Sequence, residues 1–146
     1  MLAIKKLTKE RLPSVKWQEV SDRVLGPDYD LSLVFASNEL SQKLNRAHKK
    51  KNQPTNVLSF PLDKKSGEIF LNPSVAKREA GLLGETFKNR LVYLLIHGLL
   101  HLKGYRHGSR MDVKERVFSK IFLNPNVQTH HHRLRHRHQR HQSGGV

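Results

Sequence analysis

The spacing of apolar residues predicts strands early in the chain and helices between and after them. Four segments have the length and apolar content of strands: Leu2–Lys5, Leu31–Ala36, Val57–Phe60 and Glu68–Leu71. Within the second, Leu31, Leu33 and Phe35 alternate with other residues, which is typical of a strand with one buried face. The third is stopped by Pro61, and the turn sequence LDKKSG that follows favours a hairpin with the fourth.

Helical spacing recurs in five further segments. They are the stretch from Pro13 to Gly26, a helix capped by Ser37, and the segments Val75–Leu83, Thr86–Lys103 and Met111–Phe122. Nine of the twelve residues from Leu91 to Leu102 are apolar, so we expect that helix to be buried on all sides. In the last helix, Val113, Val117 and Ile121 share one apolar face.

The periodic pattern ends at Asn124. The segment 124–146 is of low complexity, rich in histidine and arginine, and is predicted to be a disordered tail. The 146 residues correspond to about one ordinary domain, so we expect a single domain over residues 1–123.

Composition narrows the chemistry and the compartment. The chain has no cysteine, which excludes disulfides, thiolate ligands and a cysteine nucleophile and fits a reducing compartment. Met1–Leu7 lacks the continuous apolar run of a signal peptide. The longest apolar run, Leu91–Leu102, is too short to span a membrane. We therefore expect a cytoplasmic protein without a membrane partner.

The formal charge of +15 predicts a polyanionic partner, nucleic acid above all. The tail contributes only four of these charges. Four cations lie within six residues of the basic segment RAHKKK: Arg46, Lys49, Lys50 and Lys51. We interpret this segment as a strip that follows nucleic-acid phosphates. The alternative is a solvated helix end whose cations suit the helix dipole.

The stretch HGLLHLKGYRH (97–107) places three histidines in and beside the most apolar helix. His97 and His101 are four residues apart, so they project from one helix face. Gly104 ends the helix, and His107 follows the turn. Three converging nitrogens with a free fourth position form an open zinc site. The alternative is three histidines that are hydrogen-bonded without a metal.

The same spacing matches the frame H-E-x-x-H-x-x-G-x-x-H of metzincin proteases. The glutamate that acts as their general base is replaced by Gly98 in this chain. Glycine cannot move a proton, so the ligand spacing is kept while peptidase chemistry is disfavoured.

Three motifs together resemble the YbeY family of endoribonucleases, the rRNA maturation factors. They are PTNVLSFP (54–61), GEIFLN (67–72) and HGLLHLKGYRH, and the resemblance covers Leu31–Phe122. It implies an α+β fold, in which a small mixed β-sheet is packed by helices and a central buried helix carries the histidines. It also implies a zinc-dependent, single-strand-specific endoribonuclease that matures the 3′ end of the 16S-type rRNA precursor in the small ribosomal subunit. One Zn²⁺ per chain would be held by His97, His101 and His107.

Two positions depart from the family pattern. Arg106 replaces the aspartate before the third histidine, and Lys49 replaces an arginine implicated in RNA cleavage. Lys49 keeps the charge but loses the bidentate fork of arginine. The resemblance therefore implies a catalytic role for Lys49. The residues expected to bind RNA are Arg46, Lys50, Lys51 and Arg106.

The general base is not fixed by the sequence. Glu68, Glu85 and Glu115 are acidic candidates without further support. Hydrolysis by an activated water and transesterification through the RNA 2′-hydroxyl both remain open. Two other functions also remain open: a zinc hydrolase of another substrate, and a non-catalytic rRNA-binding assembly factor with a structural zinc.

Overall fold

The computed structural model describes residues 1–123, and the predicted tail (124–146) lies outside them. The elements in chain order are β1 (Leu2–Leu7), α1 (Trp17–Leu25), β2 (Asp30–Ala36), α2 (Asn38–Lys49), β3 (Val57–Asp63), β4 (Ser66–Leu71), α3 (Pro73–Leu83), α4 (Phe87–Leu102) and α5 (Ser109–Phe122). The strands form one sheet in the order β1-β2-β4-β3. β1, β2 and β4 are parallel, while β3 is antiparallel to β4. The expected α+β fold with a small mixed sheet is confirmed.

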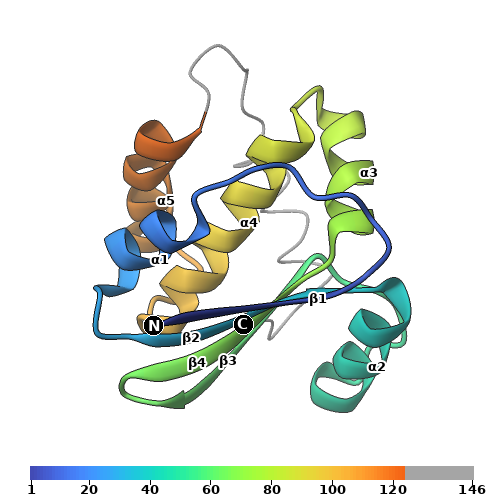
Figure 1. The fold of residues 1–146 in the computed structure, drawn as a ribbon, viewed down its shortest axis with the longest axis horizontal. Helices are drawn as coiled ribbons and strands as arrows, with labels where there is room; N and C mark the ends of the chain where they lie inside the picture. Colours follow the sequence, from blue (N-terminus) through green and yellow to red (C-terminus); the bar gives the residue numbers. More distant parts are fainter. Residues whose placement is uncertain (124–146) are drawn as a thin grey trace.

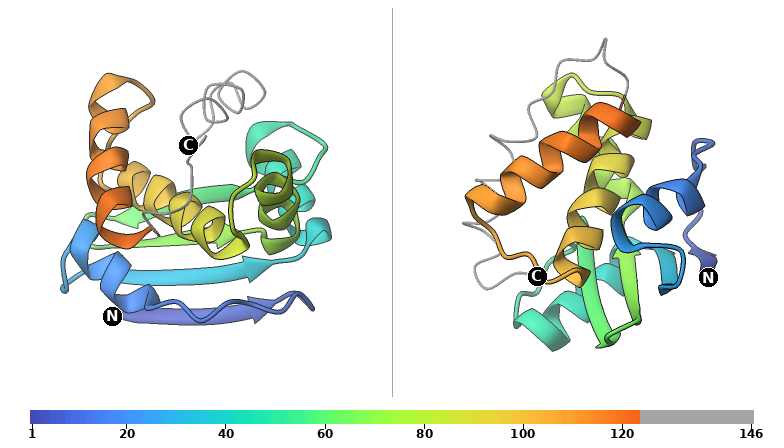
Figure 2. Two further views of the ribbon diagram at one scale, coloured as in Figure 1. Left: turned by 90° about the horizontal axis from the view of Figure 1, so that it is seen from above. Right: turned by 90° about the vertical axis from the view of Figure 1, so that its left-hand side faces the viewer.

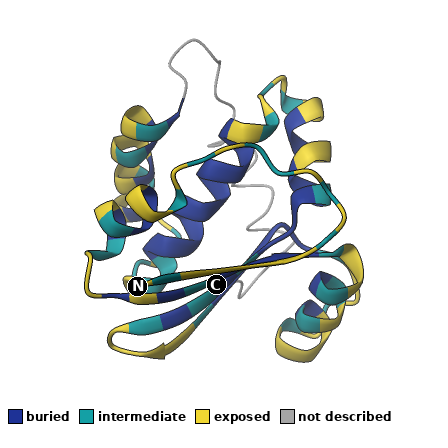
Figure 3. Ribbon diagram, viewed as in Figure 1, coloured by how far each residue is buried: buried dark blue, intermediate teal, exposed yellow. Residues whose placement is uncertain are grey.

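Helices cover both faces of this sheet (Figure 1). α4 crosses one face, with α1, α3 and α5 beside it, and α2 lies against the opposite face. The right-hand view in Figure 2 shows the same separation of α2 from α4 by the sheet. The residues from Asn89 to Leu100 are all buried, and Figure 3 shows α4 as the most continuously buried helix. The predicted central buried helix is therefore confirmed.

A glycine brings α4 into direct contact with the sheet. The Ser59 hydroxyl on β3 donates a hydrogen bond of 3.0 Å to the Gly98 carbonyl oxygen. A Cβ atom at position 98 would lie 2.9 Å from Ser59 Oγ and 3.2 Å from the side chains of Ile69 and Val57. This close approach fixes how α4 lies on the sheet and thereby where His97 is placed.

Two boundaries differ from the sequence expectation. α1 begins at Trp17 rather than at Pro13, because Leu12 and Val15 pack against the core from a non-helical segment. β3 continues through Pro61 to Asp63 instead of stopping. It is an edge strand, where a proline costs no ladder hydrogen bond, and its register shifts beyond Pro61. The predicted β3–β4 hairpin is confirmed.

The face of α5 that packs inward is not the one that carries Val113, Val117 and Ile121. Val113, Val117 and Ile121 are 49%, 47% and 46% exposed. The buried residues of α5 are Met111, Glu115 and Ser119. The aliphatic row is about half exposed, because Met111, Phe118 and Phe122 pack against the core from another side of the helix.

Within residues 1–123, no helix is both long and apolar enough to cross a membrane.

Candidate metal centre

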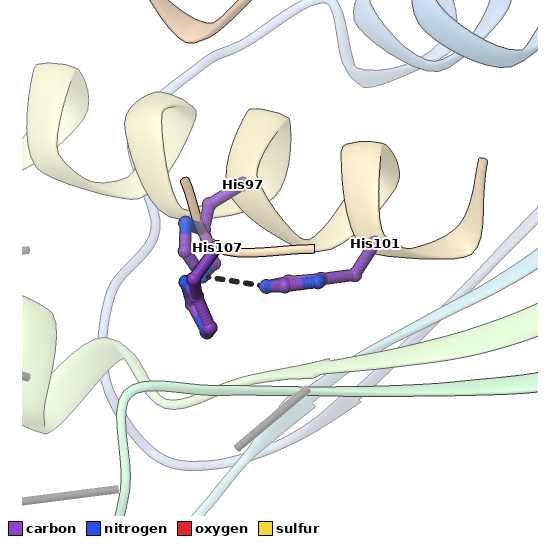
Figure 4. A group of neighbouring side chains, drawn as sticks. All are labelled: His97, His101 and His107. Carbon is purple, nitrogen blue, oxygen red and sulfur yellow. Dashed lines mark hydrogen bonds between the residues drawn. The ribbon is translucent and has the colours of Figure 1, made fainter. Parts of the chain in front are cut away.

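Three histidines converge at the C-terminal end of α4 (Figure 4). His97 and His101 project from one face of α4, and His107 comes from the loop between α4 and α5. One ring nitrogen from each lies within 4.8 Å of the other two. The Nε2 atoms of His97 and His101 are 3.1 Å apart. Two nitrogens bound tetrahedrally to one zinc ion are separated by about 3.3 Å, so this geometry fits a shared metal.

Groups behind two of the rings fix how they face the centre. His97 Nδ1 lies 2.7 Å from Glu115 Oε2, and His101 Nδ1 lies 3.0 Å from the Tyr105 carbonyl oxygen. Both partners accept hydrogen bonds, so the proton of each neutral ring belongs on Nδ1. The lone pairs on Nε2 then face the other histidines. This arrangement is typical of histidines that bind metals.

The environment keeps His101 neutral. Burial, the largest cause, and the neighbouring His97 and His107 together lower the pKa of His101 to about 2, against the opposing hydrogen bond to the Tyr105 carbonyl oxygen. A neutral imidazole keeps the lone pair that a metal requires. The histidine cluster (His97, His101 and His107) is therefore a possible metal site, with three nitrogen donors of the kind that suits zinc.

Glu115 is the residue of this site whose position the sequence did not reveal. It was one of three acidic candidates for the base, yet it is 1% exposed and contacts His97. The other two lie elsewhere. Glu85 pairs with Arg90. Glu68 lies on β4 between Gly67 and Ile69, which face α4, so the Glu68 side chain points to the opposite face of the sheet. The signal in the sequence that could have placed Glu115 is its spacing of four residues from Met111, which puts both on the inward face of α5.

Lys49 lies within electrostatic reach of the histidine cluster. Its positive charge contributes to the lowered pKa of His101. Burial lowers the pKa of Lys49 itself, and the charge of Lys51 acts in the same direction. These cations come from the end of α2 and the residues after it, so the basic segment approaches the cluster from the α2 side of the sheet.

The other expected RNA-binding residues differ in exposure. Arg46, Lys50 and Arg106 are exposed. Lys51 is half-buried, and its Nζ atom is shielded from solvent without a hydrogen-bond partner among the described residues. Arg106 lines a depression formed by residues 103–110, which also contains His107 and no acidic residue. The sequence analysis did not identify Arg110, which lines the same depression.

Two polar residues of the PTNVLSFP motif serve the fold instead of the site. The Asn56 side-chain amide donates to Glu79 at 3.1 Å, and Ser59 holds the Gly98 carbonyl. Phe60 packs against His48 and Phe70, with ring centroids 4.7 and 5.7 Å away. These contacts explain much of the motif as packing between β3, α2 and α4.

Comparisons with known proteins agree with this geometry. The family model described as "Endoribonuclease YbeY" matches residues 3–121. Relatives with that name include one from Geobacter metallireducens, 34% identical over 71% of this chain and 83% of its own length. Another, from Aquifex aeolicus, is 31% identical over 82% of this chain and 84% of its own length.

Two further matches differ in extent. A relative of the same name from Ehrlichia canis is 45% identical, and the chain spans about half of its length (56%). The solution structure of a Thermotoga maritima protein superposes with a TM-score of 0.61 at 25% identity, covering 82% of this chain and 87% of that one.

Proposed function

Because the chain belongs to the YbeY family of endoribonucleases, we propose that it cuts single-stranded RNA at the histidine cluster with one zinc ion bound per chain. The observation that carries the proposal is the convergence of three ring nitrogens within 4.8 Å beside a surface rich in cations. A nuclease needs both a metal ligand set and a place for phosphates.

His97, His101 and His107 would hold the zinc ion. When bound, zinc supplies Lewis-acid polarisation of a phosphoryl oxygen and lowers the pKa of a coordinated water to about 7. Burial lowers the pKa of His101, so this ligand is neutral at working pH. Glu115 and the Tyr105 carbonyl hold two of the rings in place.

The cations around the cluster have separate tasks in this proposal. Lys49 faces the reacting phosphate and stabilises the negative charge that grows in the transition state. Arg46, Lys50 and Lys51 bind phosphates on the α2 side, and Arg106 binds a phosphate at the depression beside His107. The Lys51 ammonium is shielded from solvent and has no acceptor among residues 1–123, so it would turn outward to reach a phosphate.

The family name supports an RNA substrate, and we propose that it is the precursor of the small-subunit (16S-type) rRNA. Cleavage would mature its 3′ end and contribute to ribosome quality control. The place of action is then the cytoplasm, where ribosomes are assembled.

The test is cleavage of a 5′-labelled single-stranded RNA from the 3′ end of the small-subunit precursor. We expect cleavage by the purified full chain, its loss after chelation, and its return on addition of zinc. The same RNA annealed to its complement is the control and should be cut much less. A 2′,3′-cyclic phosphate on the product indicates attack by the 2′-hydroxyl, whereas its absence indicates hydrolysis.

Two results would redirect the proposal. Tight RNA binding without cleavage in any metal would favour the non-catalytic assembly factor. Cleavage of a peptide substrate faster than of RNA would favour a zinc hydrolase of another class.

A further inference from the structure

We propose that Glu115 is a positioning residue, which holds the His97 imidazole toward the metal and so sets the metal affinity of the site. This inference rests on the proposed metal site. It concerns a residue that lies on α5, outside the HGLLHLKGYRH motif and eighteen positions from its ligand.

The first argument is the closeness and burial of the pair. His97 Nδ1 and Glu115 Oε2 are 2.7 Å apart, which is the length of a charge-assisted hydrogen bond. The side chains are only 10% and 2% exposed. A buried carboxylate without a partner is strongly unfavourable, so this contact defines the orientation of both groups.

The second argument is the brace behind the carboxylate. The Tyr93 hydroxyl on α4 lies 3.5 and 3.4 Å from the two carboxylate oxygens of Glu115. The Arg90 guanidinium stands over the Tyr93 ring at 4.6 Å from its centroid. Arg90 is itself fixed by two buried carboxylates, Glu79 and Glu85. The Tyr93 and Arg90 side chains of α4 therefore restrain the Glu115 carboxylate, which has little freedom to move away from His97.

The third argument is the choice of face on α5. Met111, Glu115 and Ser119 are buried, while Val113, Val117 and Ile121 remain about half exposed. The inward side also carries Phe118 and Phe122, which pack against the core, so burial of apolar area and the contact with His97 favour the same orientation. The observed orientation is the one that delivers a carboxylate to His97.

A carboxylate in this position has two effects on the ligand. It keeps the ring proton on Nδ1, so that Nε2 offers its lone pair to the metal. It also raises the electron-donating power of the imidazole. Loss of such a partner typically weakens metal binding by about 10–100-fold.

The experiment compares zinc affinity with the stability of the metal-free fold in the full chain. Zinc affinity is measured by competition with a chromophoric chelator, and stability by thermal unfolding in excess chelator. Glu115→Gln keeps the shape and an acceptor but removes the charge, and we expect about tenfold weaker zinc binding. Tyr93→Phe removes only the brace and should give a smaller loss. Glu39→Gln changes an exposed carboxylate in the first turn of α2, outside this brace, and should leave the affinity unchanged.

Two controls separate this proposal from others. The triple variant with His97, His101 and His107 changed to Ala measures zinc held elsewhere in the full chain. If that variant binds zinc as tightly as the original chain, the metal site itself is wrong. If only the triple variant loses zinc and Glu115→Gln binds within twofold of the original, the positioning role is wrong. A fall in metal-free stability without a change in affinity would likewise overturn it, since Glu115 would then be purely structural.

Discussion

The two ends of α4 bury polar side chains in opposite ways. Near its start, Arg90 is fully buried, with its guanidinium 3.2 and 3.4 Å from the carboxylates of Glu79 and Glu85. Near its end, His97 and His101 turn their Nε2 atoms toward each other at 3.1 Å, with His107 beside them. One end pairs a cation with anions, while the other brings together groups of the same kind.

This difference separates a structural polar cluster from a functional one. The ion pairs at Arg90 are closed within the fold, because each charge meets an opposite charge. At the histidine cluster, the Nε2 atoms of His97 and His101 face each other without an opposite charge between them, and a shared cation would supply one. Burial of polar groups is common to both ends, so the arrangement of donors and acceptors is what distinguishes the possible metal site from the ion pairs at Arg90.

The largest expected effect lies at the histidine end. His101→Ala should abolish zinc binding at the cluster and reduce RNA cleavage to the level of the chelated protein, while the metal-free chain stays folded. Circular dichroism with a cleavage assay checks both parts. If His101→Ala retains cleavage, the histidine end of α4 is not the site of the reaction.

At the other end, the expected effect is on stability. Arg90→Met leaves two buried carboxylates without their cation and should lower the free energy of unfolding by about 3–5 kcal/mol. Arg78→Met, at an exposed arginine on α3, is the matched control and should change it by less than about 0.5 kcal/mol. If Arg90→Met and Arg78→Met lower the free energy of unfolding equally in urea, the ion pairs of Arg90 do not stabilise the fold.

Lys49 adds a further difference between the two ends of α4, because it places a cation near the histidine cluster. Lys49→Ala should lower the single-turnover rate at saturating enzyme by about 100-fold with zinc still bound, since it removes charge from the transition state. Lys49→Arg should keep or raise the rate, because a guanidinium can grip two oxygens. Lys50→Ala should weaken RNA binding and its salt dependence by roughly one phosphate contact but leave the rate at saturation unchanged. If Lys49→Ala behaves like Lys50→Ala, Lys49 only binds phosphate.

The smallest effect concerns Gly98, which sets the seating of α4 between its two ends. Gly98→Ala places a Cβ 2.9 Å from Ser59 Oγ, and overpacking should lower the free energy of unfolding by about 1–2 kcal/mol. Gly81→Ala on α3 meets nothing within 4 Å and should raise it by about 0.5–1 kcal/mol through helix propensity. In thermal unfolding, destabilisation by Gly98→Ala together with stabilisation by Gly81→Ala supports the close contact between α4 and the sheet. Stabilisation by both variants would contradict it. Gly98→Glu should lower the free energy of unfolding more than Gly98→Ala does, and it should not create protease activity.

Local patterns predicted the parts of the site that lie close together in the sequence. The spacing of His97, His101 and His107 around Gly104 defines a helix face and a returning loop, so the cluster follows from a short segment. The buried character of α4 follows from its composition in the same way. Both features need only local geometry.

What the sequence did not predict depends on contacts between distant segments. Glu115 reaches His97 only because α5 packs against α4 with one particular face. The valine row at Val113 and Val117 satisfied the same periodicity, and no local rule separates the two faces. Likewise, the burial of Arg90 requires Glu79 from α3, which a single helix pattern does not contain.

The most direct test of this account is the zinc content of the purified full chain against its His97, His101, His107 triple-alanine variant. Elemental analysis after dialysis counts zinc per chain, and because both chains carry the same tail, zinc bound there cancels in the difference. The account predicts a difference of about one zinc ion per chain, with RNA cleavage present only in the original chain. Equal zinc content, or cleavage that survives in the triple variant, would contradict it.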